Sequence, residues 1–165
     1  MNPAALFQSS ADAWRIWAQL GSRYTEMMFA SAQVITHRTG RMRTAGSSPS
    51  AIDKQEFSLM KQEKVDAAFE SAQAMALESV FAAHRYAAFA LGQFFGAMPA
   101  LFSLALPGTA RQVSDRRIRL VRSTLQRSAV SANKLSAETG KIVQKGLTPI
   151  RKRATANAKR LKRVR

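Results

Sequence analysis

Three stretches of the chain repeat apolar residues with the period of an α-helix. From about residue 10 to 39, bulky side chains that include Trp14 and Trp17 recur every three, four or seven positions. The second stretch, about 52–98, begins amphipathic and then becomes apolar on almost every side. The third, about 112–145, carries a heptad-like apolar stripe. The β-branched residues do not alternate with polar ones, so the pattern predicts an all-α protein.

Breakers separate these stretches. Residues 39–51 contain two glycines and a proline, which is typical of a linker. We expect Pro99 to stop or kink the second helix because proline lacks an N–H and clashes with the preceding turn. Beyond Pro149 the sequence has eight basic residues and no acidic one, which predicts a disordered tail. The expected fold is a set of extended amphipathic helices, as a hairpin or loose bundle, with a coiled-coil-like third helix and a disordered basic C-terminal tail.

Charge divides the chain more sharply than hydropathy does. The net charge is +16, of which residues 1–110 contribute +1 and residues 111–165 contribute +15. We therefore predict an apolar helical body (1–110), a basic heptad-like helix that supports oligomerisation (111–148) and a cationic tail (149–165), with one apolar and one anionic partner. The N-terminus lacks a basic segment and reaches Asp12 early, so we expect a cytoplasmic protein rather than a secreted one.

The residues needed for catalysis are scarce. The chain has no cysteine, and its two histidines, His37 and His84, lie far apart in sequence. No GxSxG, GxGxxG or GxxxxGK[ST] motif is present. Glu63, Asp66 and Glu70 share a helix face, but lysines lie among them, which indicates a solvated face. The sequence predicts no catalytic residue, no cofactor, no metal and no enzymatic activity.

The apolar helices carry more bulky side chains than a chain of this size can bury by itself. We expect another copy of the chain, a bilayer or an apolar phase to cover them. Residues 86–107 contain no charged side chain and precede several arginines, so a single membrane span is an alternative interpretation. The candidate residues for binding a hydrophobic surface are Trp14, Trp17, Phe57, Met60, Phe69, Phe81, Phe89, Phe94, Phe95 and Phe102.

The basic tail has two interpretations. It could bind a polyanion through phosphate contacts that weaken with salt and read no bases. It could instead keep apolar particles apart by charge alone. The candidate polyanion-binding residues are Arg151, Lys152, Arg153, Lys159, Arg160, Lys162, Arg163 and Arg165.

Between Thr36 and Met75 the chain carries, in order, the segments THRTGRM, EFSLM, QEK and ESAQAM. Together with the Trp-bearing first helix, this stretch resembles the phasin family of polyhydroxyalkanoate granule-associated proteins. The resemblance covers about residues 10–100. It implies a helical, non-enzymatic, often oligomeric coat on cytoplasmic storage-polyester granules that limits their coalescence and lies beside other granule proteins.

Some phasins have a basic C-terminal extension linked to nucleoid binding, so the resemblance also makes DNA a candidate partner of the tail. A nucleoid-associated, DNA-binding helical protein is the alternative from another functional class.

Overall fold

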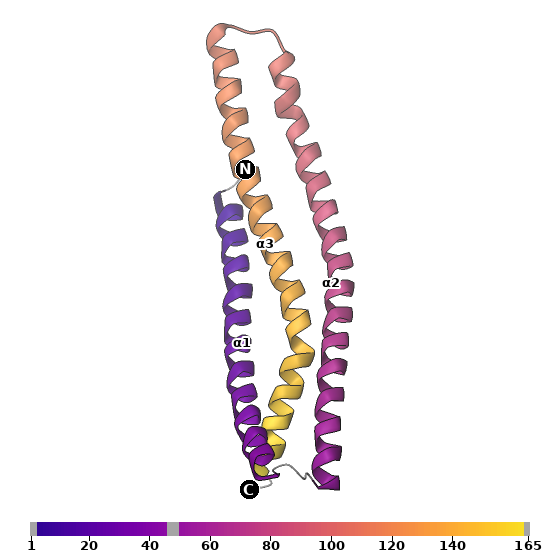
Figure 1. The fold of residues 1–165 in the computed structure, drawn as a ribbon. Helices are drawn as coiled ribbons and strands as arrows, with labels where there is room; N and C mark the ends of the chain where they lie inside the picture. The colour runs from indigo at the N-terminus through magenta and orange to yellow at the C-terminus, as the bar shows by residue number, and fades with distance from the viewer. Residues whose placement is uncertain (1–2, 46–49, 164–165) are drawn as a thin grey trace. The chain divides into compact units, whose positions relative to one another are not determined.

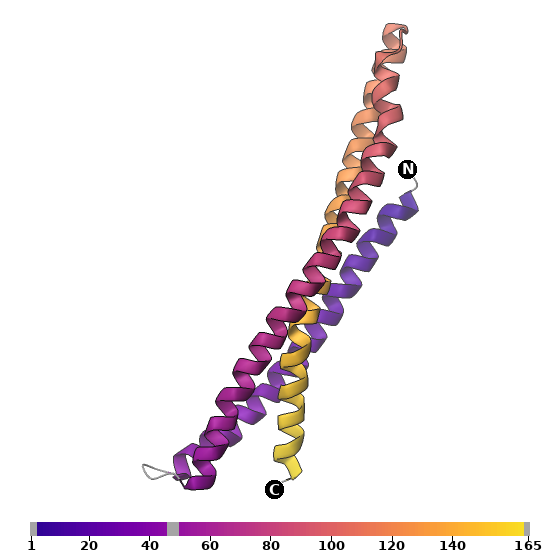
Figure 2. The ribbon, with the colours of Figure 1, turned by 90° about the vertical axis from the view of Figure 1, so that its right-hand side faces the viewer.

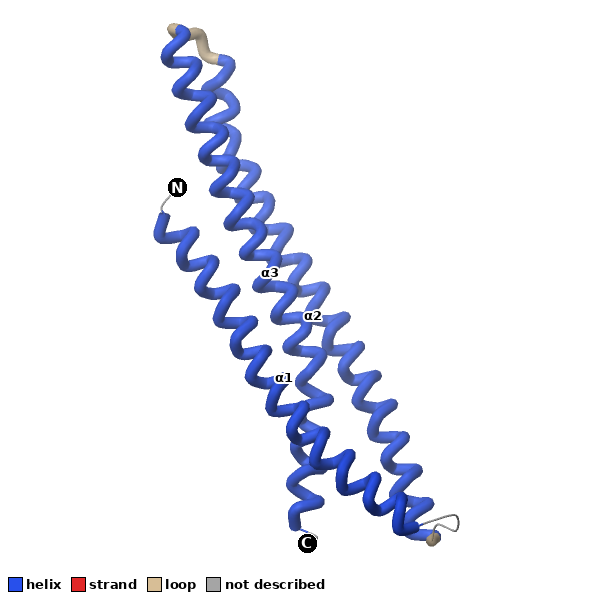
Figure 3. The backbone as a smooth tube through the Cα atoms, turned by 60° about the vertical axis from the view of Figure 1, so that its left-hand side comes forward, coloured by secondary structure: helices blue, strands red, loops and turns tan. Residues whose placement is uncertain are grey.

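The chain folds into three long helices joined by short connections (Figures 1 and 3). The computed structural model describes residues 3–45 and 50–163. Helix α1 spans Pro3–Ala45, α2 spans Ala51–Ala105 and α3 spans Ala110–Arg163. No strand occurs in these described ranges, and the predicted all-α class is confirmed.

Helix α1 is longer than predicted at both ends. It begins at Pro3, where a proline is tolerated because the first helical N–H has no intrahelical partner. Its end at Ala45 makes half of the predicted linker helical. Ser50 precedes α2, and its carbonyl oxygen accepts a hydrogen bond from Lys54 N at 3.0 Å, as expected of an N-cap residue.

Pro99 does not stop α2, which continues to Ala105. The predicted stop is wrong because proline removes only one backbone hydrogen bond, while its fixed φ is compatible with a helix. The neighbouring helix contacts this stretch, since Arg127 Nη2 donates to the carbonyl oxygen of Gly96, three residues before the proline.

Helix α3 starts with a capping box that the sequence prediction missed. Gln112 N donates to Thr109 Oγ1 at 3.4 Å, and Thr109 N donates to Gln112 Oε1 at 3.0 Å. This reciprocal pair satisfies two backbone N–H groups at the start of the helix. The start therefore lies close to residue 110 rather than 112.

The predicted disorder of the tail is wrong up to Arg163, because α3 continues through Pro149. The partners that stabilise this segment come from the other helices. Arg151 Nη1 bonds Glu26 Oε2 at 2.7 Å, and Ala158 is buried in a small core. The tail has no acidic residue of its own, but Glu26 of α1 and Glu70 of α2 supply carboxylates that pair with its arginines.

The contacts divide the chain into two units. Unit 1 comprises residues 1–17 and 79–140, and unit 2 comprises residues 18–78 and 141–165. Each unit therefore takes a segment from all three helices. These units do not coincide with the boundaries predicted from charge at 110 and 148, which stay a prediction about function.

In unit 1, α2 and α3 form a hairpin in which residues 79–105 lie beside residues 110–140 (Figures 1 and 2). The start of α1 packs on α3, where Asn133 Nδ2 donates to Ser9 Oγ at 3.2 Å and to Ser10 Oγ at 3.0 Å. The buried apolar residues of this unit are Ala13, Ala82, Val130 and Ala137.

Unit 1 also buries one carboxylate, that of Glu138, which is only 3% exposed. Arg85 bonds its Oε2 through Nη2 at 2.6 Å and Nε at 3.0 Å, and Lys134 Nζ lies 3.2 Å from its Oε1. A buried carboxylate needs such partners because its desolvation would otherwise cost several kcal/mol. This cluster fixes α2 against α3.

In unit 2, the three helix segments pack around small side chains. Ser71 Oγ donates to the carbonyl oxygen of Gly146 at 2.7 Å, which brings α2 and α3 close together. The small core of Ala30, Val34 and Ala158 joins α1 to α3. The other buried apolar residues of this unit are Leu20, Met27 and Ala67.

Candidate functional site

The candidate surface residues of α2 in unit 1 are mostly exposed. Phe95 and Phe102 are each 66% exposed, and Phe81 and Phe94 are more than half exposed. Phe94 and Phe95 pack edge to face with centroids 5.6 Å apart. With their aliphatic neighbours, the exposed residues on this part of the helix are Val80, Phe81, Leu91, Phe94, Phe95, Leu101 and Phe102; Leu106, just after the helix, is exposed as well.

Phe89 differs from these phenylalanines because it is half-buried. Its ring centroid lies 6.0 Å from that of Tyr86, one turn earlier on α2. It therefore offers less exposed ring surface to an outside partner than the other phenylalanines of this segment do.

The two tryptophans on α1 lie in different environments. Trp14 is 75% exposed, whereas Trp17 is 40% exposed. The Trp17 indole N–H donates to Ser136 Oγ at 2.9 Å, which anchors the ring to α3. Trp14 is thus the more available of the two for an outside surface.

The candidate residues in unit 2 are scattered. Phe69 is exposed, whereas Met60 is half-buried and lines a cavity of 410 Å³ between the three helix segments, together with Arg38 and Arg153. Phe57 lies in α2, but its side chain is outside the described residues. The described part of unit 2 therefore does not place Met60 and Phe69 together on one exposed face.

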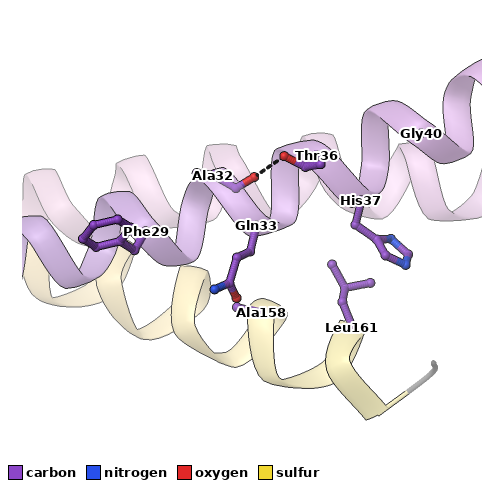
Figure 4. A pocket seen from close by; sticks show the side chains of 8 residues that line it. All are labelled: Phe29, Ala32, Gln33, Thr36, His37, Gly40, Ala158 and Leu161. Carbon is purple, nitrogen blue, oxygen red and sulfur yellow. Dashed lines mark hydrogen bonds between the residues drawn. The ribbon is translucent and has the colours of Figure 1, made fainter.

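A wide groove of 760 Å³ runs between α1 and the end of α3 in unit 2 (Figure 4). Figure 4 shows His37 beside Leu161, and Gln33 reaching toward Ala158. Nδ1 of His37 is buried without a hydrogen-bond partner. Among the described residues that line this groove, His37 carries the only acidic or basic side chain.

The candidate polyanion-binding residues lie in different environments. Arg151 bonds Glu26, and Arg153 Nη2 bonds Glu70 Oε1 at 2.6 Å, so both arginines face other helices of unit 2. Lys152, Lys159 and Arg160 are exposed. The side chains of Lys162 and Arg163, and the whole of Arg165, lie outside the described residues.

Helix α2 is also long and apolar enough, over residues 58–105, to cross a membrane by length and composition. None of its most apolar 18-residue window is buried in the structure. Among the described residues, no three His, Asp or Glu side chains gather where they could hold a metal ion.

The sequence did not indicate that the first half of α3 carries an exposed apolar stripe. Ile118, Val121 and Leu125 belong to the heptad-like apolar stripe of the sequence, which predicts packing, but they are exposed in unit 1. The packing stripe instead contains Val130 and Ala137, which are seven residues apart and carry smaller side chains. A search for the bulkiest residues therefore selects the wrong face.

Comparison of the chain with protein-family models, with curated proteins and with solved structures finds no significant match.

Proposed function

We propose that this protein is a non-enzymatic coat protein that adsorbs to hydrophobic polyhydroxyalkanoate granules in the cytoplasm and limits their coalescence, as a phasin does. The observation that carries the proposal is the exposure of Phe81, Phe94, Phe95 and Phe102 on a helix whose most apolar window is not buried. Covering one large apolar side chain contributes about 1.5–3 kcal/mol. A polyester surface offers the contact that the chain itself does not.

The net charge of the chain supports the second half of the proposal. It is +16, and cations such as Lys152 and Lys159 are exposed. Particles that carry the same surface charge repel one another, which opposes coalescence. The exposed apolar faces also favour homo-oligomers and contacts with other granule proteins.

Binding to lipid-free polyester particles tests the proposal directly. We expect the triple variant Phe94→Ser, Phe95→Ser and Phe102→Ser to bind at least tenfold more weakly, because three exposed rings no longer enter the apolar phase. A matched control replaces exposed apolar residues of unit 2, Met28, Leu59 and Val65, by serine. Equal losses of particle binding in the two variants would show that adsorption follows overall hydropathy and does not depend on the exposed phenylalanines of unit 1.

Two alternatives each rest on a specific observation. The apolar length of α2 favours a membrane span, and the exposed cations near the end of α3 favour binding to DNA. A fluorescent fusion in polyester-accumulating cells separates the three functions. Rims around inclusions support the coat, envelope labelling that resists carbonate washing supports the span, and chromosome labelling without inclusions supports the nucleoid-associated protein.

A further inference from the structure

The first half of α3 carries an exposed aliphatic strip in unit 1. Ile118, Val121 and Leu125 are 55%, 59% and 67% exposed and follow the spacing of one helix face. They line a shallow groove of 490 Å³, together with Arg117 and Arg122. We call these five residues the α3 strip. It combines apolar contact area with two flanking cations.

The arginines of this region fall into two classes. Arg116 and Arg127 face α2, because Arg116 Nη1 donates to the carbonyl oxygen of Leu106 at 2.7 Å and Arg127 donates to that of Gly96. The outer class is exposed and has no ion pair or hydrogen bond within the described chain. It consists of Arg111, Arg117, Arg119 and Arg122.

The charge around the α3 strip is not compensated locally. Asp115 is the only acidic residue between positions 86 and 127. Four outward arginines with one carboxylate leave a strongly positive helix face. The arginines favour an anionic partner, whereas the aliphatic side chains between them favour an apolar one.

We propose that the α3 strip binds an anionic phospholipid surface, with its aliphatic side chains at the acyl boundary and its arginines on the phosphate groups. A guanidinium donates two parallel hydrogen bonds to a phosphate. Amphipathic helices with cations beside an apolar face lie in the interfacial plane of anionic lipids. The inference goes beyond the proposed coat function and does not depend on polyester binding.

Two other occupants fit the α3 strip less well. A second copy packed symmetrically on it would place arginines opposite arginines, and such like-charge contacts are strongly unfavourable. The phosphates of a nucleic acid would bind the arginines, but its phosphate and sugar groups offer no apolar contact to Ile118, Val121 and Leu125. Anionic lipid is the partner that uses both halves of the surface.

Cosedimentation of the full chain with vesicles tests this proposal. One set contains phosphatidylglycerol and phosphatidylcholine, and the other contains phosphatidylcholine alone. We expect Arg117→Gln with Arg122→Gln to weaken binding to the anionic vesicles on the order of thirtyfold, because each cation near such a surface contributes substantially. The matched control, Lys54→Gln with Lys61→Gln, removes the same charge from exposed positions of unit 2 and should keep most of the binding.

Two further variants complete the design. Arg117→Lys with Arg122→Lys retains the charge and should lose less than the glutamine pair. Ile118→Ser with Val121→Ser should weaken binding to the anionic vesicles although the charge is unchanged. Far-ultraviolet circular dichroism confirms that each variant keeps its helix content.

Several results would overturn the inference. Equal losses of vesicle binding in Arg117→Gln with Arg122→Gln and in the control Lys54→Gln with Lys61→Gln would show a general effect of net charge. Equal binding to both vesicle sets would remove the role of the headgroup. Unchanged vesicle binding by Arg117→Gln with Arg122→Gln would also overturn it. Tighter self-association of that variant would then assign the α3 strip to a second copy, whereas weaker DNA retardation would assign it to nucleic acid. Binding to lipid-free polyester particles is measured in parallel, and we expect the arginine pair to keep it, so failure of the lipid site and failure of the coat function are distinguishable.

Discussion

Gly140 lets α1 and α3 approach closely in unit 1. A Cβ at this position would lie 2.6 Å from Ile16 Cγ2, and the β-branched isoleucine has little freedom to move away. We expect Gly140→Ala to lower the free energy of unfolding by about 1–3 kcal/mol, since overpacking outweighs the gain in helix propensity. Urea unfolding followed by circular dichroism measures this loss.

Gly21 is the matched control, because a Cβ there would meet nothing within 4 Å. Gly21→Ala should raise the free energy of unfolding by up to about 1 kcal/mol through helix propensity alone. If Gly140→Ala proved as stable as Gly21→Ala, the close approach of the two helices would be disproved.

Single residues also show where sequence reasoning fails. The pattern in α1 selected Trp14 because it is bulky, yet the buried positions are Ala13, Leu20, Met27 and Val34, each seven residues after the last. The helical period was therefore predicted correctly, whereas the face was displaced by one residue at Trp14. Alanine gives a weak hydropathy signal, so a pattern search cannot recognise a core built largely from it. The exposure of most of the candidate phenylalanines has the same origin, since small residues fill the interior.

At the scale of elements, the end of α3 shows why local composition misled the prediction. Helix existence followed from periodicity, and the three helices were predicted on that basis. The segment past Pro149 pairs with Glu26 and Glu70, which lie on other helices and cannot be paired with the tail by reading along the sequence. The inward-facing arginines of the tail were missed for the same reason.

This arrangement predicts which tail cations reach a polyanion. Lys152 and Lys159 are exposed and seven residues apart, so they share a face of α3. We expect Lys152→Gln with Lys159→Gln to weaken retardation of duplex DNA and to reduce the slope of log affinity against log salt by about two. Gel shifts over a range of salt concentrations measure both effects.

The control for this prediction is Arg151→Gln with Arg153→Gln, which removes the same charge from ion-paired positions. It should keep most of the DNA retardation and instead lower the stability of unit 2 by about 1 kcal/mol, because these ion pairs are partly exposed. Deleting the segment would be less informative, since Ala158 belongs to the core. Comparable losses of DNA binding in the two pairs would show that the arginines leave their carboxylates to bind DNA.

At the scale of the whole molecule, mostly small residues fill the interior of each unit, and most large apolar residues stay outside. Hydrophobic burial within one chain is therefore modest, and contact with an outside apolar phase would add stabilisation that the isolated fold lacks. Composition and length predicted this excess of apolar surface. They could not show how it is distributed, because that depends on which helix faces meet across the chain.

Two tryptophans on one helix allow that distribution to be followed during adsorption. Trp17→Phe leaves only Trp14, which is 75% exposed, and Trp14→Phe leaves only Trp17, whose indole N–H bonds Ser136. When the chain binds lipid-free polyester particles, we expect the Trp14 emission to shift to shorter wavelength and to become protected from acrylamide quenching. An exposed indole that enters an apolar phase loses its contact with water.

The Trp17 signal is the internal reference for this measurement. Its ring is already held against α3, so adsorption that preserves unit 1 should change its emission much less than that of Trp14. A bound chain in which Trp14 stays accessible to acrylamide would exclude the start of α1 from the adsorbing surface. Large and equal changes at both tryptophans would mean that the hydrogen bond between Trp17 and Ser136 breaks, and that unit 1 opens when it spreads on the particle.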